Sequence, residues 1–91
     1  MPDTRAWTFY VLRCADGSLY CGIALDAADR VRIHNAGQGA DYTARRRPVR
    51  LVHTEIHPTK VAAHRREVQV KAWRSGRKEQ LVRGFPSAGS G

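Results

Sequence analysis

The fold is decided by residues 7–24, which read WTFYVLRCADGSLYCGIA. Residues 7–14 are rich in aromatic and β-branched types, which favour a strand. The Asp16-Gly17 pair that follows is the strongest short signal for a hairpin turn. Residues 19–24 then have the composition of a returning strand. The stretch therefore predicts a β-hairpin with one tyrosine on each arm.

The register of this hairpin decides whether the two tyrosines can act together. A two-residue turn would pair Tyr10 with Ile23. Because successive residues in a strand alternate between faces, Tyr10 and Tyr20 would then point to opposite sides of the sheet. Convergence of their hydroxyl groups requires an extra loop residue or a β-bulge. We predict one of these between residues 14 and 19.

The rest of the chain predicts helices on a small sheet. Asp26 and Thr59 are suitable N-caps, because each precedes a helical pattern. In the third strand, simple alternation places Leu51 and His53 on one side. The expected elements are a helix over 27–36, a loop over 37–48, a strand over 49–56, a helix over 60–74 and a short helix over 77–83. The order β-β-α-β-α-(α) predicts an α+β fold, a small three-stranded antiparallel sheet flanked by helices. We expect one domain over residues 1–83 and a flexible tail over 84–91.

The chain is strongly basic, which points to a polyanionic partner. It has 91 residues, sixteen Lys and Arg against eight Asp and Glu, and a formal charge of +8. Thirteen of the basic residues are arginine. The alternative is a basic surface without function, but the clustering of the arginines favours nucleic acid. In residues 41–47, Tyr42 stands beside Arg45, Arg46 and Arg47, which suits a clamp on a phosphate backbone.

The sequence gives no sign of a membrane or metal-cluster protein. No apolar run approaches the roughly 18 residues of a membrane span. The N-terminal residues lack the apolar stretch of a signal peptide, so we expect a cytoplasmic protein. Cys14 and Cys21 are expected to be free thiols, since they have no recognisable zinc-ligand spacing.

Several side chains suit phosphodiester hydrolysis, which needs an activated water and neutralisation of phosphoryl charge. Tyr10 could act as general base if nearby cations lowered its pKa from about 10. Arg30 and His34 are four residues apart and share a helical face. A guanidinium matches two phosphate oxygens, and a histidine can transfer a proton near neutral pH. On composition alone the tyrosines are better interpreted as ordinary strand aromatics, and the charged pair as a solvated helix face.

The chain resembles a small stand-alone GIY-YIG domain, the fold of a class of nucleases. The two signature triplets appear as Thr8-Phe9-Tyr10 and Tyr20-Cys21-Gly22. Thr8 stands where the family name has glycine, and Cys21 where it has isoleucine. The resemblance runs from about Trp7 to Val82. It places the later family residues on Arg30, His34, Tyr42 and Glu67, and implies that Glu67 binds the metal.

The leading hypothesis is a divalent-metal-dependent endonuclease that hydrolyses phosphodiester bonds, with Mg²⁺ or Mn²⁺ as cofactor. DNA is favoured over RNA, and selectivity is expected for nucleic-acid structure rather than sequence. The predicted catalytic residues are Tyr10, Tyr20, Arg30, His34, Tyr42 and Glu67; Glu67 is the metal ligand, and the predicted nucleic-acid contacts are Arg32, Arg45, Arg46 and Arg47. The alternatives are a non-catalytic nucleic-acid-binding module and a subunit of a larger nuclease.

Overall fold

The computed structural model describes residues 5–83, so the predicted tail at 84–91 lies outside the described residues. Its elements are β1 (Trp7–Arg13), β2 (Leu19–Ala24), α1 (Ala27–Asn35), α2 (Asp41–Ala44), β3 (Arg50–His57), α3 (Lys60–Lys71) and α4 (Ser75–Arg83). The α+β class and the predicted order are confirmed. The short helix α2 is an addition, since it interrupts the segment expected to be a loop. Within residues 5–83 no helix is long and apolar enough to cross a membrane.

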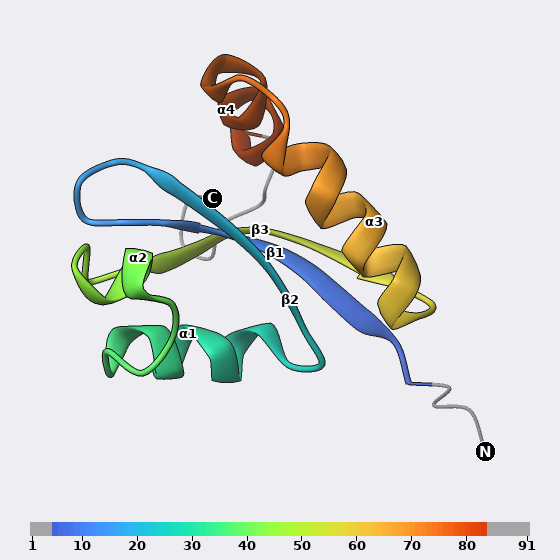
Figure 1. Ribbon diagram of the computed structural model, residues 1–91, viewed down its shortest axis with the longest axis horizontal. Coiled ribbons are helices and arrows are strands. Elements are labelled where there is room, and N and C mark those ends of the chain that lie inside the picture. The colour runs from blue at the N-terminus through green and yellow to red at the C-terminus, as the bar shows by residue number, and fades with distance from the viewer. Residues whose placement is uncertain (1–4, 84–91) are drawn as a thin grey trace, which may run out of the picture.

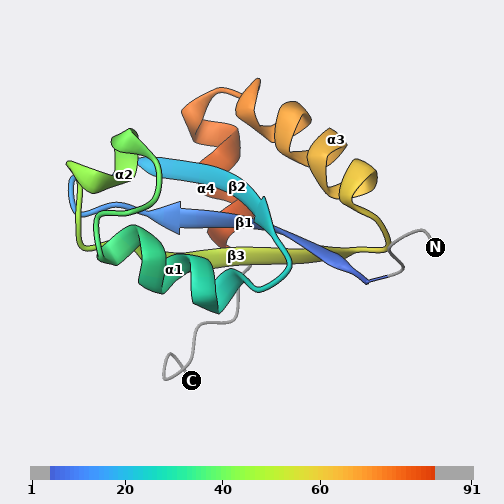
Figure 2. The ribbon, with the colours of Figure 1, turned by 60° about the horizontal axis from the view of Figure 1, so that its bottom comes forward.

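The sheet has the order β2-β1-β3, with β1 antiparallel to both neighbours. Figure 1 shows α1 and α2 on one side of the sheet and α3 and α4 on the other. In Figure 2, α1 lies in front of the strands and α4 behind them, while α3 runs beside the edge formed by β2. Helices thus cover the sheet from both sides.

The central strand β1 is buried on both faces and divides the core in two. Phe9 and Val11 belong to the cluster that includes Val70 of α3, on the side of α3 and α4. Tyr10 and Leu12 belong to the other cluster, which lies toward α1. All four β1 side chains are at most 2% exposed. Tyr10 is therefore a core residue as well as a candidate for chemistry.

The hairpin has the longer loop that a shared tyrosine site requires. Tyr10 pairs with Gly22 and Leu12 pairs with Tyr20, and the connection between the strands consists of residues 14–18. Because paired residues point to the same face, Tyr10 and Tyr20 lie on one side of the sheet. The predicted departure from a two-residue turn is confirmed.

Strand β3 carries an irregularity that the sequence pattern did not reveal. Its register against β1 shifts by one residue between Val11 and Leu12. Leu51 packs with the cluster toward α1, whereas His53 contacts the ring of Phe9 on the opposite face. The prediction that Leu51 and His53 share one side was wrong, because a β-bulge reverses the alternation between them.

Candidate active site

The ring of Tyr10 lies across β2 at its cross-strand partner, Gly22. A Cβ atom added to Gly22 would lie 2.5 Å from the Tyr10 hydroxyl oxygen and 2.6 Å from Cζ of the same ring. Real Cβ atoms do not approach so closely, so no larger residue fits without displacing the phenol. This contact explains why the second triplet ends in glycine: Gly22 leaves room for the hydroxyl group of Tyr10, the last residue of the first triplet.

We therefore expect Gly22→Ala to destabilise the fold by about 1–3 kcal/mol, the usual cost of overpacking a core. The free energy of unfolding in urea measures this effect. Gly76→Ala in α4 is the matched control, because a Cβ there meets nothing within 4 Å. The control should be neutral or slightly stabilising, since alanine favours helix over glycine. Equal stability of the two variants would contradict the packing argument.

A chain of buried hydrogen bonds runs from Tyr10 through His34 to Thr43 in α2. The Tyr10 hydroxyl oxygen is 3.1 Å from Nε2 of His34. On the other side of the ring, Nδ1 is 2.7 Å from the Thr43 hydroxyl oxygen. That hydroxyl donates to the carbonyl oxygen of Ala40 at 2.9 Å. His34 and Thr43 are both 0% exposed, so the connection is shielded from water.

The direction of this chain follows from the number of protons available. Thr43 has one hydroxyl proton and gives it to a carbonyl oxygen, which can only accept. Its oxygen must therefore accept from His34, so Nδ1 carries the imidazole proton. The lone pair of Nε2 then faces the hydroxyl of Tyr10, which donates to it. The arrangement orients a neutral histidine as a proton acceptor for the phenol.

Burial keeps His34 neutral. Removal of the ring from water lowers the pKa of His34 below its usual 6.5, and the positive charge of Arg30 lowers the pKa further. Both effects disfavour the imidazolium form. At neutral pH the Nε2 lone pair therefore stays available, as proton acceptance from Tyr10 requires.

The same burial acts against the lowered pKa expected for Tyr10, as far as the protein's own groups are concerned. The sequence hypothesis required cations to lower the pKa of its phenol, but that pKa is raised from 10.0. Desolvation is the largest cause, and it outweighs the hydrogen bond and the charge of Arg30, which act in the opposite direction. Tyr10 is therefore a neutral phenol in the free protein. It can become a base only as its own proton moves to His34.

Tyr20 and Tyr42 continue the site toward the surface. Their rings are stacked, with centroids 6.0 Å apart and planes 25° apart. The Tyr20 centroid is 5.3 Å from that of His34. Tyr42 is exposed, and the Arg46 guanidinium carbon lies 3.9 Å from the centre of its ring. A column of rings thus joins the buried histidine to the protein surface.

Glu67 approaches this cluster from α3. Its carboxylate forms an ion pair with Lys71, with 3.2 Å between Nζ and Oε2. Nε2 of His64 lies 3.9 Å from the other carboxylate oxygen. The Lys71 ammonium group is in turn 5.8 Å from the centre of the Tyr20 ring. The carboxylate is near enough to Tyr10 for its negative charge to contribute to the raised pKa of the phenol. Helix α3 thus supplies an acidic group beside a cationic and aromatic site.

The donor set around Glu67 fits one kind of metal ion. In the part of the chain that the structure describes, no group of three or more His, Cys, Asp or Glu side chains could hold a metal. A transition-metal cage built from protein ligands is therefore not formed by residues 5–83. Mg²⁺ keeps several waters and commonly uses one or two carboxylates together with substrate phosphates. Glu67 fits such a hydrated ion.

The structure separates the predicted arginines by role. Arg30 joins the cluster through its hydrogen bond and charge on Tyr10. Arg32 instead projects into solvent and forms an ion pair with Asp29, within its own helix. Arg45 is exposed on the loop. Of the predicted set, only Arg30 therefore touches the buried chain of hydrogen bonds.

Two of the three loop arginines hold the loop itself. Arg46 forms an ion pair with Asp16 at 3.0 Å and donates to the carbonyl oxygen of Tyr42. Arg47 donates to the carbonyl oxygens of Ala44 and Asn35. These guanidinium groups therefore fix the position of α2, and through it Thr43, in addition to adding positive charge.

Thr43 and Gly39 are site residues that sequence reasoning missed. A Cβ on Gly39 would lie 2.2 Å from Nδ1 of His34, so the loop backbone packs directly on the imidazole. One signal was present for Thr43: it follows Ala40 by three residues, the spacing at which a threonine hydroxyl bonds a backbone carbonyl. The burial of this hydroxyl against a histidine 9 residues away had no local signal.

Comparison with known proteins agrees with this architecture. The family model described as the GIY-YIG catalytic domain matches residues 6–80. A UPF0213 protein of Staphylococcus aureus is 47% identical over 74 residues, which cover 81% of this chain and 90% of that protein. The chain therefore belongs to the GIY-YIG family, whose catalytic domain is nuclease-like.

Two solved structures share the fold. The solution NMR structure of a UPF0213 protein from Bacillus halodurans has a TM-score of 0.56 at 44% identity, covering 86% of this chain and 83% of that one. The solution NMR structure of a protein from E. faecalis has a TM-score of 0.60 at 40% identity, covering 91% of this chain and 88% of that one. The predicted family resemblance is confirmed.

Proposed function

We propose that this protein is a divalent-metal-dependent endonuclease that hydrolyses phosphodiester bonds in DNA and selects its substrate by structure rather than by sequence. The observation that carries the proposal is the oriented hydrogen-bond chain from Tyr10 to His34 and Thr43. Every buried tyrosine hydroxyl needs an acceptor, but here the acceptor is a neutral histidine whose second nitrogen is bonded to Thr43, so it can also take the phenol proton. The nearby Arg30 and Glu67 supply the charges that phosphodiester chemistry uses.

In this proposal Tyr10 and His34 act as one general base. As the phenol oxygen takes a proton from the attacking water, the phenol proton moves to Nε2 of His34, whose other nitrogen stays bonded to Thr43. The imidazolium that forms remains close to the phosphate negative charge. Because the base is a pair, neither side chain needs a strongly shifted pKa of its own to remove the proton.

The remaining groups position and neutralise the phosphate. Arg30 contacts the phosphoryl oxygens through its forked donors. Tyr20 donates a hydrogen bond to the scissile phosphate, and Tyr42 stacks on a neighbouring base. Glu67 holds a hydrated Mg²⁺ or Mn²⁺, which when bound would supply charge neutralisation at the phosphate and leaving oxygens.

Thr43 acts in this proposal as a positioning residue that fixes the tautomer of His34. Thr43→Val keeps the shape but removes the acceptor for Nδ1–H. We expect cleavage to fall at least about tenfold, since general-base catalysis typically contributes 10²–10⁴-fold. We also expect the ¹⁵N NMR shifts of the imidazole to move toward the Nε2–H tautomer. Thr43→Ser, which keeps the hydroxyl, should restore both properties. An unchanged tautomer in the valine variant would contradict the assigned role.

A second function is favoured by one observation. The Glu67 carboxylate is already paired with Lys71, and Tyr10 is nearly fully buried. A non-catalytic nucleic-acid-binding module could retain both residues for stability alone. The two functions can be told apart by measuring cleavage, because only the enzyme produces shorter nucleic-acid fragments.

The deciding experiment is an assay of cleavage by purified protein. Supercoiled, single-stranded and branched DNA, together with a single-stranded RNA, would be incubated with Mg²⁺, with Mn²⁺ and with EDTA. Metal-dependent cutting, strongest on branched or single-stranded DNA, is expected. Binding without cutting on every substrate would instead favour the binding module. Equal cutting in EDTA would remove the metal from the proposal.

A further inference from the structure

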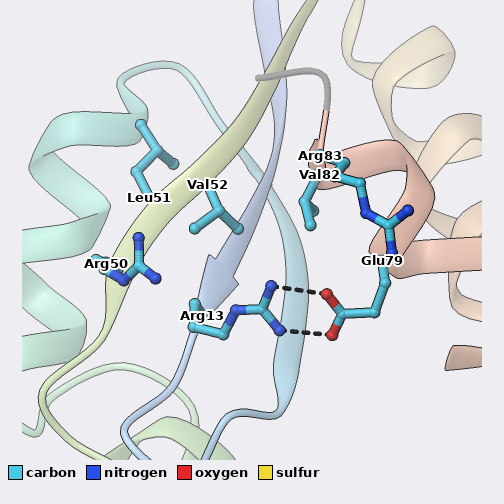
Figure 3. Close-up of a pocket in the computed structure, with 7 residues that line it drawn as sticks. All are labelled: Arg13, Arg50, Leu51, Val52, Glu79, Val82 and Arg83. Carbon is cyan, nitrogen blue, oxygen red and sulfur yellow. Dashed lines mark hydrogen bonds and ion pairs between the residues drawn. The ribbon is translucent and has the colours of Figure 1, made fainter. Parts of the chain in front are cut away.

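A second basic site lies on the α4 side of the sheet, where β1 ends, β3 begins and α4 packs. Figure 3 shows side chains from these three elements around a hollow of about 280 Å³. We call it the arginine cleft, and its main lining residues are Arg13, Arg50, Val52, Glu79, Val82 and Arg83. None of them belongs to the tyrosine cluster described above.

Arg13 is held rigidly in this cleft. Its guanidinium group makes two parallel bonds to the Glu79 carboxylate, at 2.5 and 2.7 Å. It also donates to the carbonyl oxygen of Gly17 at 3.0 Å. The guanidinium has five N–H donors, so this arrangement fixes the group in place and leaves donors for a further acceptor.

Arg50 and Arg83 carry the unbalanced charge of the cleft. Both residues are exposed. Within residues 5–83, no hydrogen bond or ion pair engages either guanidinium group, and Arg83 acts on Glu79 only through its charge. The cleft is thus lined by three arginines and one carboxylate, and that carboxylate is already paired with Arg13. The cleft is built for an anion.

Two further hollows lie beside the cleft, on the way to the tyrosine cluster. One, of about 400 Å³, shares Arg13 and Arg50 with the cleft and extends to Gly17. The other, of about 260 Å³, contains Gly17, Glu79 and Lys78 and reaches Tyr42. The three hollows thus share lining residues around the β1–β2 loop, between the cleft and the outer ring of the tyrosine column.

We propose that the arginine cleft is a second phosphate-binding site, which holds the backbone of a nucleic-acid strand whose neighbouring segment lies at Tyr42 and Tyr20. This inference rests on the proposed function, because it extends the same substrate along the protein. A phosphate between Arg50 and Arg83 would neutralise their charge. Val52 and Val82, both nearly buried, form the apolar floor of the cleft.

The succession of basic hollows that ends at Tyr42 favours a nucleic acid over an acidic peptide. A phosphodiester strand carries one charge on each nucleotide and is therefore anionic along its full length. It can meet Lys78 and the cleft arginines in turn while one base stacks on Tyr42. An acidic protein segment would satisfy the arginines but would have no flat ring to place on the exposed tyrosine.

The test is fluorescence anisotropy with labelled single-stranded DNA of about 4 and about 16 nucleotides, in EDTA so that no strand is cut. The double variant Arg50→Gln/Arg83→Gln removes the two unpaired charges. The matched control, Arg65→Gln/Arg74→Gln, removes two exposed arginines that line none of these hollows. Both doubles have the same net charge.

We expect the cleft variant to bind the long strand about tenfold more weakly than wild type at low salt, and its log–log salt slope to be shallower by about 1.4. The short strand, which can occupy the tyrosine cluster alone, should be affected much less. The control should bind both strands nearly as wild type does. A polyglutamate of equal charge should displace the long strand poorly.

The inference is overturned if both doubles weaken binding equally, if neither does, or if polyglutamate competes as well as DNA. These outcomes are separate from the fate of the proposed enzyme. Wild-type protein that cuts DNA while the cleft variant binds normally would reject the cleft alone. Selective loss of long-strand binding in a protein that never cuts would reject the nuclease and keep the cleft.

Discussion

Tyr10→Phe is expected to reduce the rate of metal-dependent cleavage at least about a hundredfold, within the range that a general base contributes. The substitution removes only the hydroxyl group, so the ring continues to fill the core beside Gly22. It leaves Nε2 of His34 buried without a donor, which should also cost about 1–3 kcal/mol of stability. Single-turnover cleavage, measured with unfolding in urea, separates the two effects.

A control variant that is destabilised to a similar extent shows whether the lower cleavage rate of Tyr10→Phe comes from the lost hydroxyl or from lower stability. Val11→Ala lies on the same strand but in the opposite core cluster, and it should destabilise the fold while retaining cleavage. Tyr20→Phe provides the second comparison. If Tyr20→Phe abolished cleavage and Tyr10→Phe did not, the base would have to be assigned to Tyr20.

The same pair of residues predicts the acid limb of the pH profile. Cleavage requires neutral His34, and burial lowers the pKa of His34 in the folded chain below 6.5. Activity should therefore persist as the pH falls through 6.5 and decline only at lower pH, when the imidazole becomes protonated. A decline centred above pH 6.5 would mean that His34 does not accept the proton.

Glu67→Gln is expected to abolish metal-dependent cleavage, by at least about a hundredfold, because a metal ion contributes several kcal/mol to charge stabilisation. Binding of DNA in EDTA should be unchanged or slightly tighter, since the substitution removes a negative charge from a basic surface. Cleavage and anisotropy measured on one preparation test both expectations.

Asp29→Asn is the matched control for this substitution. It removes the same charge from a side chain that pairs with Arg32 on α1. The control should keep its cleavage and its response to Mg²⁺. Cleavage that survives in Glu67→Gln at ordinary Mg²⁺ concentrations would exclude Glu67 as the metal ligand. Unaltered binding with no cleavage even in wild type would favour the binding module.

Much of the fold was accessible from local patterns. The aromatic and β-branched run around Tyr10 predicted β1, and Asp26 and Thr59 do accept N-cap hydrogen bonds, at 3.0 and 3.1 Å. Within the β1–β2 hairpin the alternation of faces is regular, so the need for a longer loop before Tyr20 could be argued in advance. These features depend on neighbours within a few positions along the chain.

What could not be predicted depends on contacts between distant segments. The pKa of Tyr10 rises because the loop and α1 bury its phenol, and no local pattern reports that burial. The tautomer of His34 is set by Thr43, whose position depends on α2. The bulge in β3 likewise follows from how two strands meet. Sequence therefore named the reactive groups but could not give their protonation states.

Three features of the site also belong to the core: the Tyr10 hydroxyl, the His34 imidazole and the missing side chain of Gly22. This double role affects how activity could be lost during evolution. A descendant that no longer needed to cut DNA would still be held to these residues by the stability of its fold. Glu67 is held less tightly, because its side chain is 15% exposed and its carboxylate pairs with Lys71, whose own side chain is 51% exposed. A retained tyrosine and histidine are therefore weak evidence that a member of this family is an active enzyme. The fate of the glutamate is the better marker of a pseudoenzyme.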